Sequence, residues 1–561
     1  MNKGVIVHCK EKTGQYLSPY FLVSKPNGEY RFILNLKGLN KFIKTDHFKM
    51  HDLRTVLKLI LQDDFMASID LQDAYFLVSV DKSCRKYLRF KFQNNIYEFT
   101  VLPFGLCTSP YVFTKILKPV MSQLRMQGLM SVDYLDDILL IGKNYEECFN
   151  NVKLTRSLLE SLGFVLNEKK CKLSPSKQCR FLGFEINSHE CIVFIPEEKK
   201  IKILNLIKKM ISKSDSKVRE VAQLIGNLVA ACPGVRYGWA HIKTLEREKE
   251  LALIFNRMDY ERKMLISTRV KTELNWWVEN LPEAFSSFKN TSIDKVIFTD
   301  ASTSGWGAVL ENKEIHGFWT EKEKREHINL LELKAIWLAL LSFETEIKNC
   351  HILLRVDNTT AISYINKMGG IKYQKFNRIA AQIWHWAEKN NIWLHAEHIP
   401  SKQNLIADRL SRLKNVDTEW ELNEYAFREI TNVFGFPEID LFATNVNSKC
   451  KKFCSWITEP DAWAIDAFSI SWSEFYFYAF PPFSMILRTL NKIVQDKARG
   501  ILIVPDWKAQ AWYPLFKKLL EKEPLKFKPS QQLLLSPCRS VIHPRAQNLT
   551  LLSSIVSGKL I

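Results

Sequence analysis

Two short apolar runs meet at a pair of adjacent acids in the segment SVDYLDDILLIG, residues 131–142. Apolar runs of this length predict two strands, and Asp is common in the turn that joins such strands. The pattern therefore predicts a hairpin with Asp136 and Asp137 at its tip. A turn explains these acids without any chemistry, and for an isolated motif that explanation is the commoner one.

A further acid, Asp70, ends the apolar run MASID, residues 66–70. If its strand lies beside the hairpin in one antiparallel sheet, three carboxylates come close together and repel one another unless cations neutralise them. Mg²⁺, or Mn²⁺ in its place, suits such oxygen ligands while keeping substrate phosphates in its shell. Two such ions would activate a primer 3′-hydroxyl and stabilise the leaving pyrophosphate, so the sequence predicts nucleotidyl transfer.

The charge balance favours a polyanionic partner. The 561 residues include 79 Lys and Arg against 60 Asp and Glu, a formal net charge of +19. A cationic surface releases counterions from nucleic acid, although a basic but merely solvated surface is the ordinary alternative. The 46% of hydrophobic residues is enough for several cores, which excludes a disordered basic tail. Without a signal peptide or an apolar run of membrane-spanning length, we expect no membrane partner and a cytoplasmic or nuclear location.

Shifts in pattern divide the chain into segments. Residues 1–190 are rich in short strands, and residues 191–290 are helical and basic. Strand–helix alternation characterises residues 291–415, and a short linker is expected at 416–429. The last segment, 430–550, is dense in aromatic residues and prolines and predicts a smaller α/β unit. The expected fold class is therefore a multidomain α/β (α+β) protein.

The motifs SIDLQDAYF, LPFGLCTSP and YLDD stand in the order and approximate spacing of the palm motifs of retroelement reverse transcriptases. This part of the chain resembles that family. The resemblance implies a right-hand polymerase with fingers, palm and a helical thumb. It also implies that Asp70, Asp136 and Asp137 are catalytic and bind two metal ions. The carbonyl of Leu71 is then expected to help hold the ion on the nucleotide side.

The same resemblance assigns residues to the nucleotide. Tyr75 matches an aromatic steric gate that leaves no room for a 2′-hydroxyl, and a buried core tyrosine is the alternative. In the hairpin SKPNGEYRF, Arg31 matches an arginine that grips the triphosphate, and Lys25 is a second candidate cation. Gly105 of LPFG lets the backbone approach the nucleotide closely.

The resemblance also gives roles to residues near these acids. Tyr134 opens the YLDD tetrapeptide and is expected to support its acids. The segment GFVLNEKKCKL resembles the part of the family that closes the palm, and it offers Lys169 or Lys170 as a proton donor. The sequence does not choose between these two lysines.

A second set of acids lies between residues 291 and 415. Asp300 ends VIFTD, Asp357 ends ILLRVD, Asp408 lies in IADRLSR and Glu332 lies in LLELKA. Each has an ordinary explanation as a strand-end or helix acid. Glu332 is the telling case, because it interrupts an apolar helix face, where an unpaired charge is expensive. Four acids from a sheet and two helices can bind two metal ions that orient water for phosphodiester hydrolysis.

TDAS, LLELKA, VDN and HIPSKQNLIADRLSR resemble the D-E-D-D signature of ribonuclease H. The resemblance implies that all four acids are catalytic metal ligands, and it gives Asn404 a supporting role. One departure lies in the loop before Asn404, where Ser401 and Lys402 replace a mobile histidine that several relatives carry. His398 precedes the proline of this loop and is not expected to replace that histidine.

The segments FGFPEIDLFATNVNSKC, DAFSISW, YAFPPF and GILIVPDW resemble a phage-type N6-adenine methyltransferase domain. Such domains stand behind the ribonuclease H of DIRS-type tyrosine-recombinase retrotransposons. The methyltransferase motif needs Asp or Asn before Pro-Pro to accept hydrogen bonds from the adenine amino group, and this chain has Phe480 there. The sequence also lacks a Gly-rich loop for the methyl donor. We therefore expect no S-adenosylmethionine, and a degenerate domain with a binding or scaffold role.

The leading hypothesis is an RNA-directed DNA polymerase with ribonuclease H activity. Its partners would be an RNA template, a DNA primer, RNA–DNA hybrid and dNTPs, with two Mg²⁺ (or Mn²⁺) ions per active site. One alternative is a catalytically silent nucleic-acid-binding relic of a retrotransposon, and the presence of all seven acids argues against it. A DNA methyltransferase is the other alternative, which Phe480 disfavours. Because the fingers begin abruptly, Met1 is expected to start within a longer element, and the oligomeric state is left open.

Overall fold

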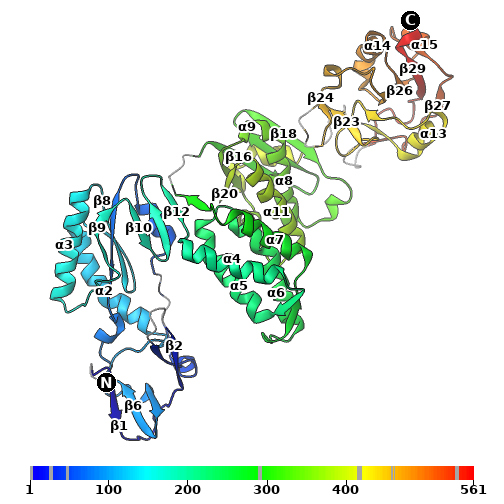
Figure 1. Ribbon diagram of the computed structural model, residues 1–561. Helices are drawn as coiled ribbons and strands as arrows, with labels where there is room; N and C mark the ends of the chain where they lie inside the picture. Colours follow the sequence, from blue (N-terminus) through cyan, green and yellow to red (C-terminus); the bar gives the residue numbers. More distant parts are fainter. Residues whose placement is uncertain are drawn as a thin grey trace. The chain divides into compact units, whose positions relative to one another are not determined.

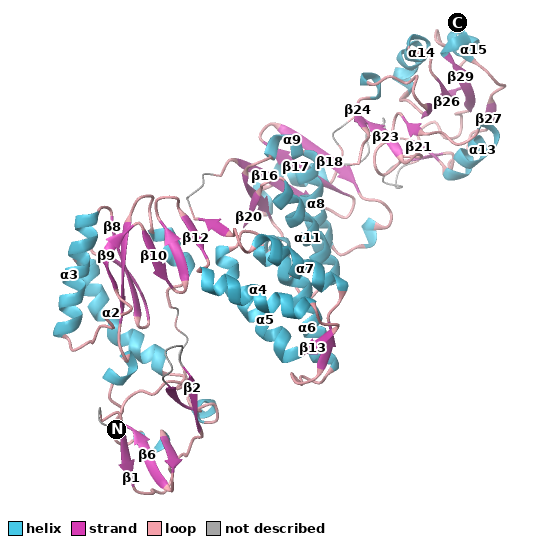
Figure 2. Cartoon of the chain, in the orientation of Figure 1, coloured by secondary structure: helices cyan, strands magenta, loops and turns pink. Residues whose placement is uncertain are grey.

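The computed structural model describes residues 4–24, 30–45, 48, 50–288, 293–413, 420–456, 459, 461–536 and 542–560. It confirms the mixed α/β, multidomain class (Figures 1 and 2). The chain divides into two compact units, Met1–Thr291 and Ser292–Ile561. Among the described residues, no helix combines the length and the apolar character that a membrane span needs.

Two small sheets open the first unit. β1 (Ile6–Cys9), β6 (Asn95–Phe99) and β5 (Arg89–Phe92) form one antiparallel sheet, and β2 (Tyr20–Ser24) pairs with β3 (Tyr30–Leu34) in another. Leu34 of β3, Phe90 of β5 and Phe99 of β6 share one apolar core. This core joins strands that lie more than fifty residues apart in the chain.

The central sheet of the first unit is antiparallel and has the order β7-β8-β4-β9. Its strands are β4 (Phe65–Asp70), β7 (Met130–Tyr134), β8 (Asp137–Gly142) and β9 (Lys172–Ser176). Successive strand residues face opposite sides. Ile69 and Leu140 accordingly share one core with residues of α2 (Ser109–Met126) and α3 (Tyr145–Ser161), the two helices beside this sheet in Figure 2, whereas Met66 and Leu139 belong to a different core.

The rest of the first unit combines a second sheet with helices. β10 (Gln178–Phe181), β11 (Phe184–Asn187), β12 (Ile192–Phe194) and β15 (Phe285–Ser287) pair in that order. The helices of the segment 191–290 are α4 (Glu197–Ile211), α5 (Val218–Ala231), α6 (Lys243–Phe255) and α7 (Thr268–Asn280). Their apolar stripes form one large core, with Trp277 fully buried.

The second unit begins with a five-stranded mixed sheet of order β18-β17-β16-β19-β20. Its strands are β16 (Lys295–Ala301), β17 (Gly305–Leu310), β18 (Lys313–Phe318), β19 (His351–Val356) and β20 (Trp393–His398). β16 and β19 are parallel neighbours, so their carboxyl ends lie at the same edge. The helices are α8 (Ile328–Ser342), α9 (Glu344–Ile347), α10 (Thr359–Asn366), α11 (Gln374–Lys389) and α12 (Leu405–Ser411).

The tail contains a seven-stranded sheet of order β24-β23-β22-β25-β26-β29-β27. The strands are β22 (Ile439–Asp440), β23 (Lys452–Ser455), β24 (Ala464–Ile465), β25 (Tyr476–Ala479), β26 (Arg499–Pro505), β27 (Leu525–Phe527) and β29 (Leu551–Ser557). β29 runs antiparallel to both its neighbours, and the five strands from β24 to β26 are parallel. α13 (Glu424–Phe434), α14 (Ile486–Gln495) and α15 (Tyr513–Leu519) complete it.

The tail differs from its expected limits of 430–550 at both ends. Part of the expected linker at 416–429 is ordered, because Asn423 caps α13, and Ala426 and Phe427 of that helix are buried in the tail core. At the other end, β29 lies inside the sheet and is buried along its whole length. The buried residues Phe427, Ile430 and Phe434 recur at helical spacing, so the sequence carried a signal for α13 that the expected linker boundary did not use.

Candidate active sites

Three carboxylates meet at one end of the central sheet of the first unit. Asp70 ends β4 and faces Asp137, the first residue of β8, across the ladder. Asp136 lies in the turn between β7 and β8, and its carbonyl accepts a hydrogen bond of 2.8 Å from the Leu71 amide. Leu135 adopts a left-handed φ of 56°, which closes this tight turn. The structure thus brings together the predicted hairpin and the predicted strand-end acid.

The electrostatics of this cluster follow from its crowding. Burial, together with the charges of Asp136 and Asp70, raises the pKa of Asp137 to about 6. Lys170 offsets part of the repulsion, since its Nζ donates to Asp70 Oδ2 at 3.0 Å. Of the two lysines that the sequence leaves open, Lys170 is therefore the one placed against the acids.

A cavity of about 430 Å³ opens beside the three acids. Lys170, Lys172 and Arg180 line the same cavity, and Arg180 also pairs with Glu198. The predicted site did not include Lys172 or Arg180. Both lie on strands, β9 and β10, whose position depends on long-range pairing, so the sequence around them, including the segment GFVLNEKKCKL that contains Lys172, does not place them at the acids. Cations close to clustered acids suit a site that takes both metal ions and phosphates.

Tyr75 lies next to the acids on a single 3₁₀ turn, Ala74–Leu77. Its half-buried ring has its centroid 5.2 Å from Phe104 and 5.7 Å from Phe113. Burial and the nearby charge of Asp136 raise the pKa of the Tyr75 hydroxyl to about 12, so this group stays neutral. Phe104, which carried no predicted role, fixes one side of the Tyr75 ring.

The structure describes the other residues predicted to contact the nucleotide to different extents. Gly105 has a left-handed φ of +95°, and a Cβ there would lie 3.0 Å from the Leu34 carbonyl oxygen. Leu71 is buried directly after Asp70. Arg31 belongs to β3, but only its backbone is described, and Lys25 lies outside the described residues. Tyr134 ends β7 and pairs with Asp137.

A second cluster lies at the shared carboxyl edge of β16 and β19. Asp300 belongs to β16, Asp357 directly follows β19, and Glu332 projects from α8. One ligand atom from each of these residues lies within 4.8 Å of the other two. Asp408, on α12, is not part of this close group, and its Oδ1 accepts a 2.8 Å hydrogen bond from Arg412 Nε.

The second cluster fits a divalent cation. Burial and the charges of Asp300 and Asp357 raise the pKa of Glu332 to about 9, and burial raises that of Asp300 to about 6. Glu332 Oε2 is buried without a hydrogen-bond partner. An unpaired buried carboxylate is costly, and a bound cation removes that cost. The oxygen donors of these three residues are the kind that Mg²⁺ prefers.

Two side chains support this second cluster. Asn404 is buried at the start of α12, and its Nδ2 donates to the Thr299 carbonyl at 2.9 Å. Ser401, in the loop before Asn404, donates through Oγ to Asp357 Oδ2 at 2.8 Å. Lys402 and His398 are exposed.

Comparison with known proteins identifies the first site region. Residues 23–186 match the family described as "Reverse transcriptase (RNA-dependent DNA polymerase)". These residues include the first acid cluster, so this cluster lies in a segment that is similar to that family.

Curated relatives extend the similarity beyond that domain. The enzymatic polyprotein of Figwort mosaic virus (strain DxS) is 24% identical over 442 residues, covering 73% of this chain and 60% of the relative. The Transposon Tf2-3 polyprotein of Schizosaccharomyces pombe is 25% identical over 422 residues, covering 70% of this chain and 29% of the relative. The chain thus spans about three fifths of the viral relative and less of the transposon relative.

Solved structures also resemble this chain, with lower sequence identity than the curated relatives. The foamy viral protease-reverse transcriptase in complex with RNA/DNA hybrid is 16% identical, with a TM-score of 0.45, and the match covers 75% of this chain and 56% of that chain. The same viral protein in complex with dsDNA is 18% identical, with a TM-score of 0.44, and covers 71% and 80%.

We expect Mg²⁺ binding at the Asp300–Glu332–Asp357 cluster to strengthen as the pH rises from 6 to 9. Without metal, the raised pKa of Glu332 keeps this carboxyl protonated at neutral pH, and an incoming ion must displace the proton. Each unit of pH below 9 should therefore raise the required Mg²⁺ by up to about tenfold. Calorimetric Mg²⁺ titration in buffers of different ionisation enthalpy measures the released proton. Glu332→Gln is the control, and equal proton release by both proteins would contradict the expectation.

Proposed function

We propose that this chain is an RNA-directed DNA polymerase with ribonuclease H activity, derived from a DIRS-type retrotransposon. The observation that carries the polymerase assignment is the cross-strand pair of Asp70 and Asp137 beside Asp136, inside the segment that matches reverse transcriptases. The three acids share a cavity with Lys170, Lys172 and Arg180, which suits a nucleoside triphosphate with its metal ions. The template would be RNA, the primer DNA and the substrates dNTPs.

In this proposal Asp70, Asp136 and Asp137 hold two Mg²⁺ or Mn²⁺ ions, and the Leu71 carbonyl assists. Bound there, the ions would lower the pKa of the primer 3′-hydroxyl and stabilise the charge that develops on the leaving pyrophosphate. Lys170 is within reach of the acids and would supply a proton to the pyrophosphate. Tyr134, before the acids, would support their turn.

The incoming nucleotide would be selected by shape and charge. Tyr75 is held against Phe104 and Phe113, so its ring presents a fixed wall beside Asp136. A fixed ring at the sugar discriminates by excluding the 2′-hydroxyl. Arg31 and Lys25 would contact the triphosphate. Gly105 would leave space for the nucleotide beside the backbone.

Ribonuclease H activity is proposed for the second cluster. Asp300, Glu332, Asp357 and Asp408 would hold two Mg²⁺ ions, which would orient water and stabilise the oxyanion in hydrolysis of the RNA strand of a hybrid. The buried, unpartnered Glu332 Oε2 supports this assignment, because a bound metal ion would give this oxygen the partner that it lacks. Asn404 would hold α12 and its Asp408 against β16.

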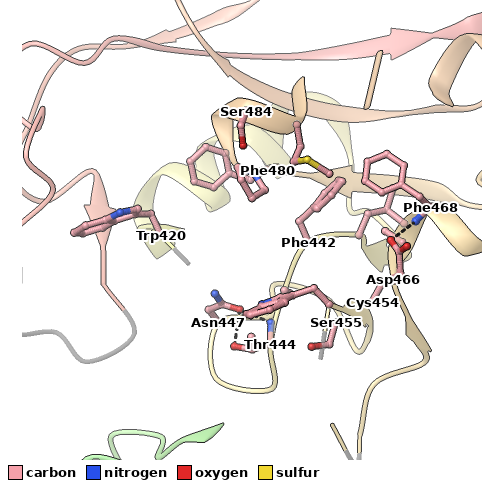
Figure 3. Close-up of a pocket in the computed structure, with 16 residues that line it drawn as sticks. Trp420, Phe442, Thr444, Asn447, Cys454, Ser455, Asp466, Phe468, Phe480 and Ser484 are labelled. Atoms are coloured by element: carbon pink, nitrogen blue, oxygen red, sulfur yellow. Dashed lines mark hydrogen bonds between the residues drawn. The ribbon is translucent and has the colours of Figure 1, made fainter. Parts of the chain in front are cut away.

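The tail is proposed to be a methyltransferase-like domain that has lost methylation. Its parallel strands place a cavity of about 340 Å³ where open α/β sheets bind ligands, outside the carboxyl ends of β22, β24 and β25. Figure 3 shows Phe480, Phe442 and Trp420 around this cavity. None of the described residues that line it is Lys or Arg, so the carboxylate of S-adenosylmethionine would meet no cation there. A binding or scaffold role fits these walls better than methyl transfer.

Two single substitutions should separate the two proposed activities. Asp136→Asn should lower primer extension on an RNA template with Mg²⁺ by more than about 100-fold, since it removes a metal ligand, and should leave hybrid cleavage intact. Asp357→Asn should do the reverse. Glu190→Gln, an exposed acid away from both clusters, is the matched control. Equal extension by wild type and Asp136→Asn would sink the polymerase assignment.

Tyr75 should control sugar selection. Tyr75→Ala removes the ring and is expected to raise incorporation of ribonucleotides relative to deoxyribonucleotides by about tenfold or more. Tyr75→Phe keeps the ring and should keep wild-type selectivity. Single-nucleotide incorporation kinetics measure the ratio. If Tyr75→Ala selects like wild type, Tyr75 is a core residue and not a gate.

The tail should transfer no methyl groups. We expect the full chain to bind no S-adenosylmethionine in calorimetry and to leave adenine unmethylated, because Phe480 cannot accept hydrogen bonds from the amino group. Incubation of DNA with radiolabelled methyl donor, calibrated against an active adenine methyltransferase, checks this. Robust methylation of DNA would overturn the proposal for the tail.

A further inference from the structure

One buried hydroxyl connects two of the acids in the second unit. Ser411, the last residue of α12, is 1% exposed. Its Oγ lies 2.6 Å from Asp300 Oδ2 and 2.9 Å from the Asp408 carbonyl oxygen. The hydroxyl has a single proton, and the bond to a carboxylate is the stronger of the two. Ser411 therefore donates to Asp300 from the same helix that carries Asp408.

The backbone of Ser411 is also fixed. Ser302 Oγ donates to the Ser411 carbonyl at 2.6 Å and accepts hydrogen bonds of 3.1 Å from the Ser304 and Gly305 amides. This arrangement ties the end of α12 to the turn between β16 and β17. Ser411 thus has little freedom to leave Asp300.

Close packing removes the remaining freedom of α12. Gly307 of β17 faces this helix, and a Cβ at that position would lie 2.4 Å from Leu410 Cβ and 2.8 Å from the Ser411 amide nitrogen. The helix therefore rests directly on the strand. At its other end, Asn404 donates to the Thr299 carbonyl, one residue before Asp300. Both ends of α12 are thus held close to this acid.

We propose that Ser411 is a positioning residue for the metal ligands of the ribonuclease H site. It fixes one oxygen of Asp300, and so holds this carboxylate in one orientation at the edge that Glu332 and Asp357 share. Through the same helix it fixes the distance between Asp300 and Asp408. This inference rests on the proposed ribonuclease H function and gives a role to a residue to which the sequence motif assigned none.

A fixed distance between ligands matters because two ions must bind at once. A carboxylate that rotates freely loses orientational entropy when it binds a metal ion, whereas a fixed one has lost it on folding. Loss of a partner that orients a metal ligand typically costs about 10–100-fold in metal affinity or activity. The expected effect of losing the Ser411 hydroxyl is therefore on the metal requirement, with a smaller effect on cleavage at saturating metal.

The test compares Ser411→Ala with wild type in the full chain. The Mg²⁺ concentration for half-maximal hybrid cleavage should rise about 10–100-fold, while primer extension by the same protein stays unchanged. Mn²⁺ binding followed by electron paramagnetic resonance, in an Asp136→Asn background that weakens the other site, should show the same loss of affinity without relying on activity. Ser342→Ala is the matched control, since Ser342 Oγ is buried on α8 without a hydrogen-bond partner.

A second variant provides the test if Ser411→Ala does not fold. Ser411→Cys keeps the volume of the side chain but donates weakly, so it should also raise the Mg²⁺ requirement, and Ser411→Thr, which keeps the hydroxyl, should restore it. A Mg²⁺ requirement within twofold of wild type in the Ala variant, or in the Cys variant if Ser411→Ala does not fold, overturns the inference. Absence of hybrid cleavage by the wild-type protein overturns the proposed ribonuclease H function instead.

Discussion

Repulsion between clustered carboxylates is the constraint on which both sites depend. In each cluster the acids are brought together by backbone pairing and are partly removed from water, so their ionised forms disfavour one another. The raised pKa values of Asp137 and Glu332 express that conflict. The fold tolerates it only when a proton, a lysine or a metal ion compensates the charge. Metal binding and the integrity of each site are therefore linked through the same groups.

The two clusters reach this condition by different geometries. In the first unit an antiparallel ladder places Asp70 and Asp137 directly opposite, and a two-residue turn adds Asp136. In the second unit two parallel strands deliver Asp300 and Asp357 to one edge, and a helix brings Glu332. The first arrangement is open and is balanced by Lys170. The second is more deeply buried, and although Arg412 beside Asp408 offsets part of the charge on Asp300, Glu332 needs a proton or an entering cation.

Much of each site could be predicted from the sequence, because the acids end strands or occupy a short turn. The residues that were missed have another character. Lys172 and Arg180 reach the first cluster through long-range strand pairing, and Ser411 reaches Asp300 through the packing of α12. The sequence around each of them does not show which acid it meets. Glu332 was visible for the opposite reason, since a charge inside an apolar helix face is conspicuous in the amino-acid pattern alone. The motif predicted that Asp408 is a metal ligand. It did not predict that Asp408 lies outside the close group formed by the other three acids.

The tail also has a cavity at the carboxyl edge of its parallel strands, but the side chains that line this cavity suit a different chemistry. Its cavity also lies outside the carboxyl ends of parallel strands, yet aromatic rings form much of its wall and Asp466 supplies a single carboxylate. One acid does not create the mutual repulsion that calls for a metal ion. Phe480 offers a ring to this cavity. The tail is therefore suited to stacking and apolar contact, whereas the two acid clusters are suited to metal-assisted chemistry on phosphates.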